Sequence, residues 1–217
     1  VDGARYVPGS VDLLKLYGRP DAPNPADGGY EEYSESGYRS PGWTETYQVT
    51  SQDANSLTLE AKLSNGLELT RTFALEGDTP VVQITSTLTN DGDAKRKACL
   101  RVHPALFVDS IQQASARMRD ADGAWRFLSL TVPEDPLGEH EKWFRAADRP
   151  AGAWAVANEA TGLTVVNHFD PEQVALCYLN WNGADHRVNL ELWSNEVELA
   201  PGATLTVSHS YEVKTAR

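Results

Sequence analysis

Short runs of alternating apolar and polar residues, separated by turn-forming residues, occupy most of the chain after Trp43. Residues 81–89 (VVQITSTLT) and 187–193 (RVNLELW) are typical, because leucine and β-branched residues are frequent and apolar side chains recur at every second position. This period places the apolar side chains on one face of a β-strand. Turn sequences such as Ser64-Asn65-Gly66 and Asn182-Gly183 separate successive runs. The pattern predicts an all-β fold, a large antiparallel β-sandwich with little helix.

We expect residues 1–217 to form a single domain, since sandwiches of this length are common. Residues 1–41 are rich in Gly, Pro, Asp and Tyr and are expected to be a loop-rich segment. Residues 134–147 fit either one short helix or a long loop. The chain starts with Val1 rather than Met, so we expect a trimmed form or a piece of a longer protein. The predicted strands are residues 56–63, 67–75, 81–89, 98–108, 124–130, 152–157, 163–169, 174–181, 187–193 and 203–213.

The charge of the chain limits its partners. Asp and Glu number 31 against 19 Lys and Arg, which gives a net charge of −12. A chain without a basic stripe is a poor ligand for nucleic acid or for an anionic membrane surface, so we expect neither as a partner. No apolar run approaches the roughly 20 residues of a membrane-spanning helix.

Motifs for metals and cofactors are incomplete. Residues 90–93 (NDGD) and 120–123 (DADG) resemble parts of calcium-binding loops, but neither completes the acidic ligand set, and hairpin turns explain both. The sequence has no CxxC, P-loop, GxGxxG or GxSxG motif, and we expect no cofactor and no metal. Cys99 and Cys177 lie in apolar runs that favour buried free thiols, although a disulfide stays open. The compartment, extracellular, periplasmic or cytoplasmic, therefore stays open too.

Two predicted strands carry potential acid–base groups on their polar faces. Arg101 and His103 share one face of residues 100–104, and Asn189, Glu191 and Trp193 share one face of residues 187–193. If both faces line one cleft, an imidazole and a carboxylate meet there beside an aromatic ring, which suits sugar binding or proton transfer. The alternative is a solvated strand face with a structural histidine. Of the six tryptophans, Trp193 is the candidate sugar platform, and core packing is expected for most of the others, including Trp154.

Four segments resemble, in matching order, the galactose mutarotase-like (aldose 1-epimerase-like) superfamily. They are residues 66–73 (GLELTRTF), 81–90 (VVQITSTLTN), 100–107 (LRVHPALF) and 175–202, which contains NLELW and LAPG. The resemblance implies a β-supersandwich with a sugar-facing concave cleft. It gives His103 the position of the catalytic acid and Glu191 that of the base.

The implied reaction is the interconversion of sugar anomers. Glu191 would take the proton of the anomeric hydroxyl while His103 protonates the ring oxygen, and the opened ring would close to the other anomer. The resemblance also makes Arg71 and Arg101 candidates for binding sugar hydroxyls, with a structural ion pair as the alternative.

Two departures from the family weigh on this interpretation. Enzymes of the family usually carry a histidine in an H-G-G loop, and the matching loop here has Asp27 in that position. An ionised aspartate cannot donate a hydrogen bond to a ring oxygen. Ala105, not an aromatic residue, follows Pro104. These departures favour a carbohydrate-recognising domain of a larger glycan-processing protein, linked to an upstream domain, over an active aldose 1-epimerase. A purely structural sandwich is the third hypothesis.

Overall fold

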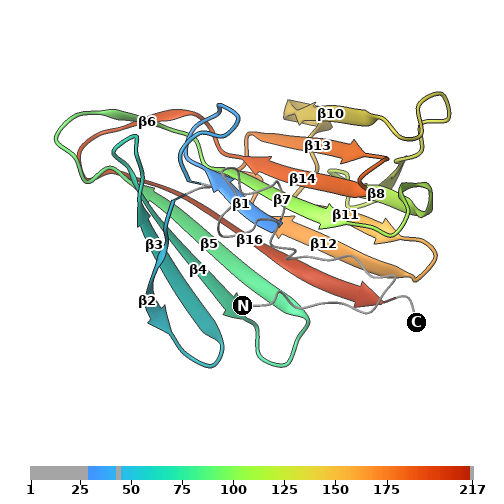
Figure 1. The fold of residues 1–217 in the computed structure, drawn as a ribbon, viewed down its shortest axis with the longest axis horizontal. Helices are drawn as coiled ribbons and strands as arrows, with labels where there is room; N and C mark the ends of the chain where they lie inside the picture. The colour runs from blue at the N-terminus through green and yellow to red at the C-terminus, as the bar shows by residue number, and fades with distance from the viewer. Residues whose placement is uncertain (1–28, 43–44, 216–217) are drawn as a thin grey trace.

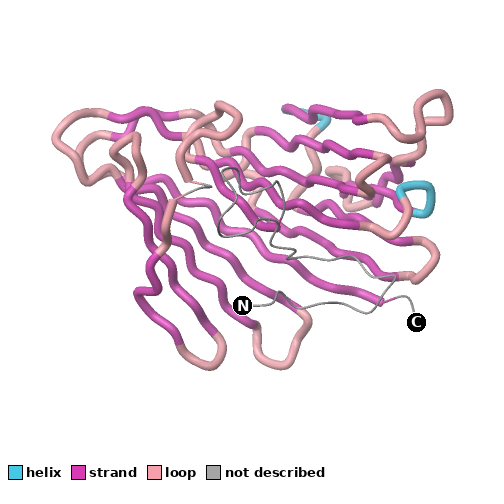
Figure 2. The backbone as a smooth tube through the Cα atoms, viewed as in Figure 1, coloured by secondary structure: helices cyan, strands magenta, loops and turns pink. Residues whose placement is uncertain are grey.

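The computed structural model describes residues 29–42 and 45–215, which form an antiparallel β-sandwich (Figure 1). A five-stranded sheet packs on part of a nine-stranded sheet, and the strands β2, β3 and β4 extend beyond the overlap (Figure 1). Helical structure in the described part is limited to two short 3₁₀ turns, η1 (Ile111–Gln113) and η2 (Ala146–Asp148) (Figure 2). The predicted all-β sandwich with little helix is confirmed.

Strands that are neighbours in each sheet are often distant in the sequence. In spatial order, the five-stranded sheet consists of β1 (Gly29–Tyr33), β7 (Arg101–Phe107), β14 (Arg187–Trp193), β13 (Leu176–Asn182) and β10 (Glu139–Arg145). In the same order, the nine-stranded sheet consists of β2 (Gln48–Gln52), β3 (Ser56–Lys62), β4 (Glu68–Leu75), β5 (Val81–Thr89), β16 (Thr204–Thr215), β12 (Leu163–Phe169), β11 (Ala153–Asn158), β8 (Ala114–Arg119) and β9 (Trp125–Ser129). A short pair, β15 (Val197–Leu199) and β6 (Arg96–Ala98), lies apart from both sheets.

Strands with strict alternation match the sequence prediction. β5, β12 and β14 have the predicted bounds, and the predictions for β3, β4, β9, β11, β13 and β16 differ from the structure by one or two residues at their ends. The predicted strand 98–108 is in fact two strands. β6 ends at Ala98 and β7 begins at Arg101, because the intervening backbone N–H groups of Cys99 and Leu100 donate to Ser34 and Ser194.

The prediction of a helix or long loop at residues 134–147 is wrong. Residues 139–145 form β10, which pairs with β13 along its whole length and is followed by η2. β10 is an edge strand, and of its side chains only Phe144 is buried in the core. Charged residues dominate its exposed positions, so its local sequence does not show the alternation of a half-buried strand. β1 was also missed, because it lies inside the segment 1–41 that was expected to be loop-rich.

The core between the two sheets is built from side chains at alternate strand positions. Val188, Leu190 and Leu192 on β14 are fully buried and belong to one cluster with residues of the nine-stranded sheet. Trp154 and Trp181 join that core, whereas Trp125 and Trp143 are 46% and 42% exposed. The expectation that most tryptophans fill the core is therefore wrong for the described residues. Cys99 and Cys177 are buried free thiols.

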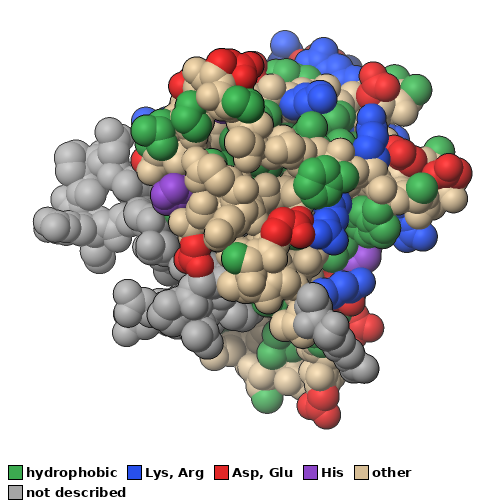
Figure 3. Space-filling view, turned by 90° about the vertical axis from the view of Figure 1, so that its right-hand side faces the viewer, with side chains coloured by type: hydrophobic (Ala, Val, Ile, Leu, Met, Phe, Trp, Pro, Cys, Tyr) green, Lys and Arg blue, Asp and Glu red, His purple; other side chains and the backbone are tan. Residues whose placement is uncertain are grey.

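The described surface carries charges of both signs. On the face shown in Figure 3, coloured Lys and Arg side chains lie among Asp and Glu side chains. Among the described residues, no helix has the length and apolar character needed to cross a membrane.

A buried polar network joins the two sheets. Glu32 of β1 is fully buried and accepts hydrogen bonds from Arg71 Nε of β4 at 2.7 Å, from the Tyr30 hydroxyl at 2.6 Å and from Ser86 of β5. The Tyr30 hydroxyl also lies 2.8 Å from His209 Nε2 of β16. Breaking a buried ion pair on one side leaves an uncompensated charge, so this network fixes where β1 sits on the nine-stranded sheet.

The network makes the stability of the fold sensitive to acid. Burial, and then the charge of Arg71, lower the pKa of His209 to about 3. A histidine in the unfolded chain titrates near pH 6.5. Below that pH the histidine binds a proton in the unfolded state but not in the native state. The free energy of unfolding therefore falls as pH falls from about 6.5 towards 3.

We predict that His209 accounts for a loss of about 2 kcal/mol in the free energy of unfolding between pH 7.5 and 5. Urea unfolding of wild type and His209→Gln at several pH values in this range measures it. The variant should lose this part of the pH dependence, whereas His140→Gln, on the edge strand β10, should keep it. Equal pH dependence in wild type and His209→Gln would contradict the assignment.

Candidate functional site

Side chains from the two strands that carry the candidate acid and base meet on the outer face of the five-stranded sheet. β7 and β14 are neighbours, with Arg101 opposite Trp193 and Ala105 opposite Asn189. Because side chains alternate, their polar positions point away from the core. The side chains brought together are Arg101, His103, Asn189, Glu191 and Trp193. We call the first four the polar cluster.

Glu191 is the centre of the polar cluster and is fully buried. Its Oε2 accepts from Arg101 Nε at 2.6 Å and from Trp193 Nε1 at 2.8 Å. Its Oε1 accepts from Arg101 Nη2 at 3.1 Å and lies 3.2 Å from His103 Nε2. The two bonds from Arg101 form a bidentate pair, the strongest arrangement for a guanidinium and a carboxylate. Both oxygens of the carboxylate are therefore engaged within the protein.

His103 lies between two carboxylates. Its Nε2 faces Glu191 and is also 3.1 Å from Asn189 Nδ2, and its Nδ1 is 3.6 Å from Glu31 Oε2. Nε2 cannot accept from the Asn189 amide and donate to Glu191 at once. The tautomer with hydrogen on Nδ1 accepts from Asn189 at Nε2, and the tautomer with hydrogen on Nε2 donates to Glu191. The tautomer of His103 thus selects its partner.

β1 adds two residues to the site that the sequence prediction missed. The Tyr33 hydroxyl donates to Glu31 Oε2 at 2.9 Å, and the Tyr33 ring lies 5.4 Å from the His103 ring. Burial, followed by the charge of Glu31, raises the pKa of Tyr33, so its hydroxyl stays a donor. The signal was present in residues 29–33 (GYEEY), where Glu31 and Tyr33 share one strand face.

An aromatic row crosses three neighbouring strands beside the polar cluster. It consists of Trp193 on β14, Tyr178 on β13 and Trp143 on β10. The ring of Trp143 lies 4.2 Å from that of Tyr178 and 5.7 Å from that of Trp193. Glu141 accepts from the Tyr178 hydroxyl at 2.6 Å and from Trp143 Nε1 at 3.1 Å. These bonds lower the pKa of Glu141 and hold the row in place at the sheet surface.

One candidate sugar contact, Arg71, does not lie in this group. Arg71 is buried between the sheets and pairs with Glu32, on the opposite side of β1 from Glu31 and His103. The structure therefore gives Arg71 the contacts of a structural ion pair, the alternative that its sequence left open. Asp27 lies outside the described residues. Within the described ranges, no group of three or more His, Cys, Asp or Glu residues could hold a metal ion.

The geometry sets what the polar cluster can do chemically. At 3.2 Å, His103 and Glu191 contact each other directly. In anomer interconversion the base acts on the anomeric hydroxyl and the acid acts on the ring oxygen. A sugar bound between His103 and Glu191 would therefore have to separate these two side chains. Arg101 Cζ lies 4.3 Å from the ring centroid of Trp193 and so supports the inner end of the aromatic row.

Comparison with solved structures shows the fold of galactose mutarotase-like proteins. A galactose mutarotase related enzyme from Lactobacillus acidophilus is 11% identical, with a TM-score of 0.61 over 85% of this chain and 78% of that one. Further structures described as galactose mutarotase-like proteins match as well. The resemblance seen in the sequence is thus confirmed at the level of the fold.

Parts of two larger proteins share the same fold. A TPR-domain containing protein from Parabacteroides distasonis is 11% identical, with a TM-score of 0.66 over 87% of this chain and 38% of that one. The alpha-galactosidase from Lactobacillus brevis is 12% identical, with a TM-score of 0.55 over 93% of this chain and 31% of that one. This chain thus spans about a third of each. No family model and no curated protein matches the sequence.

We predict that Glu191→Gln lowers the free energy of unfolding by about 3–5 kcal/mol, because it leaves the buried Arg101 without a countercharge. Urea unfolding at neutral pH measures the change. The matched control is Glu198→Gln, which removes an exposed ion pair with Lys95 and should cost less than about 1 kcal/mol. A loss for Glu191→Gln no larger than that of the control would show that the pair does not hold the cluster together.

Proposed function

We propose that the chain is a carbohydrate-recognising domain of a larger glycan-processing protein, and that sugar rings bind along the aromatic row. The observation that carries the proposal is the solvent-accessible row of Trp193, Tyr178 and Trp143 at the rim of the buried polar cluster. Aromatic faces pack against the C–H faces of sugar rings by apolar contact and by the ring quadrupole. Carboxylate and hydroxyl groups at the row, from Glu141 and Tyr178, offer hydrogen bonds to sugar hydroxyls.

The polar cluster has a positioning role in this proposal. Glu191 accepts a hydrogen bond from the indole N–H of Trp193, and Arg101 packs on the face of the same indole. Together they orient the first platform of the row. The burial of Glu191 and its four protein contacts support this role over that of a base open to substrate.

The match to parts of a TPR-domain containing protein and of an alpha-galactosidase supports the role as one domain among others. The alternative function is the interconversion of sugar anomers with Glu191 as base and His103 as acid. The direct contact between these two side chains supports this alternative. A sandwich with a purely structural role is the remaining alternative.

A glycan array followed by calorimetry tests the proposal. We expect at least one oligosaccharide to bind, and Trp143→Ala to weaken its binding about five- to tenfold through the lost stacking surface. The control is Phe127→Ala, which removes an aromatic side chain that is 61% exposed on the other sheet. Absence of binding to every glycan, or equal affinity of Trp143→Ala and wild type, would overturn the proposal.

A further inference from the structure

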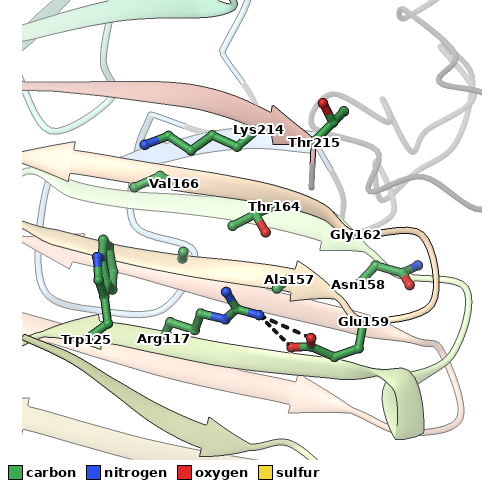
Figure 4. Close-up of a pocket in the computed structure, with 11 residues that line it drawn as sticks. Arg117, Trp125, Ala157, Asn158, Glu159, Gly162, Thr164, Val166, Lys214 and Thr215 are labelled. Atoms are coloured by element: carbon green, nitrogen blue, oxygen red, sulfur yellow. Dashed lines mark hydrogen bonds and ion pairs between the residues drawn. The ribbon is translucent and has the colours of Figure 1, made fainter. Parts of the chain in front are cut away.

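The outer face of the nine-stranded sheet contains a trough (Figure 4). The polar cluster lies on the other sheet, on the opposite side of the sandwich. The trough arises from the sequence of β11, AWAVAN, in which Trp154 and Val156 enter the core and the alternating alanines point outward. Register pairs Ala155 with Val166 and Ala157 with Thr164 of β12. Small side chains therefore form a floor where an exposed sheet face usually carries longer polar ones.

Long side chains stand around this floor. Trp125 of β9 closes one end, Arg117 of β8 and Glu159 line one side, and Lys214 of β16 stands across from them (Figure 4). They enclose a cavity of about 450 Å³. Pockets for small molecules measure about 300–1,000 Å³ and combine apolar surface with a few polar groups.

The polar groups of the walls offer donors and acceptors side by side. Arg117 Nη2 donates to both carboxylate oxygens of Glu159, at 2.9 and 3.1 Å. Hydrogen bonds from Ser115 and Arg117 lower the pKa of Glu159, which keeps it an acceptor. The Nε of Arg117 is buried and has no hydrogen-bond partner among the described residues.

The charges at the trough are balanced. Arg117 is paired with Glu159, and Lys214 Nζ lies 3.1 Å from Glu212 Oε2. An anion would have to compete with these carboxylates for the cations, and the chain as a whole carries −12. A neutral molecule with adjacent hydroxyl groups can instead donate to Glu159 and accept from Arg117 at once.

We propose that this trough is a second ligand site, separate from the aromatic row, which binds a neutral mono- or disaccharide. One sugar ring packs against the exposed indole of Trp125, above a floor in which Ala155 and Ala157 are themselves almost fully buried. Its vicinal hydroxyls bind the Arg117–Glu159 pair. The site does not depend on the polar cluster, so either site can exist without the other.

Titration of the ¹⁵N-labelled 217-residue chain with cellobiose, maltose and lactose tests the proposal. We expect at least one of these sugars to shift the indole N–H of Trp125 and the amide of Gly162, which lines the trough. Ala155→Leu fills the floor and Trp125→Ala removes the platform. Each should weaken the binding about tenfold or more.

The matched control is Ala74→Leu, which adds the same volume to β4, four strands away from β11 in the same sheet. It should leave the affinity unchanged, and thermal unfolding of each variant confirms that it is folded. Binding that is unchanged in Ala155→Leu and Trp125→Ala would overturn the proposal. Shifts confined to Trp143 and Trp193 would also overturn it while supporting the aromatic row. No shift with any of the three sugars would overturn it without supporting either site.

Discussion

The buried ion pair between Glu32 and Arg71 joins the two sheets of this sandwich. Its carboxylate comes from β1, an edge strand in which the side chains of successive residues point in opposite directions. Glu32 points inward to Arg71, and Glu31 points outward to His103. β1 pairs with another strand, β7, on one edge only, and the inward pair adds a contact to the nine-stranded sheet that helps to fix where the outward residues lie. The positions of the side chains in the outer site thus depend on an interaction in the core.

The outer site also depends on a buried ion pair, between Arg101 and Glu191. Arg101 neutralises Glu191, and the pair holds the indole of Trp193 by a hydrogen bond on one side and by stacking on the other. Desolvating two charges is costly, and in some proteins buried charges of this kind specify a geometry. In our proposal that geometry serves recognition, because Trp143 at the outer end of the aromatic row stays open to solvent.

Local alternation was enough to predict most of the half-buried strands, the shared face of Arg101 and His103, and the shared face of Asn189, Glu191 and Trp193. It failed where pairing rather than pattern makes a strand. β10 has the local sequence of a charged helix or loop, and it is a strand because β13 supplies its hydrogen bonds. β1 has polar side chains on both faces, so its sequence resembles a loop, and it pairs with β7. The pairing of Arg71 with Glu32, 39 positions away in the chain, likewise depends on how the two sheets stack, which no local window contains.

In our proposal Glu191 and His103 position a binding surface and do not interconvert anomers. The optical rotation of freshly dissolved α-D-glucose and α-D-galactose, followed with increasing concentrations of the wild-type chain, tests it directly. We predict that both sugars relax at the rate of buffer alone at every protein concentration. A rate that rises in proportion to the protein and falls back in His103→Asn would contradict it.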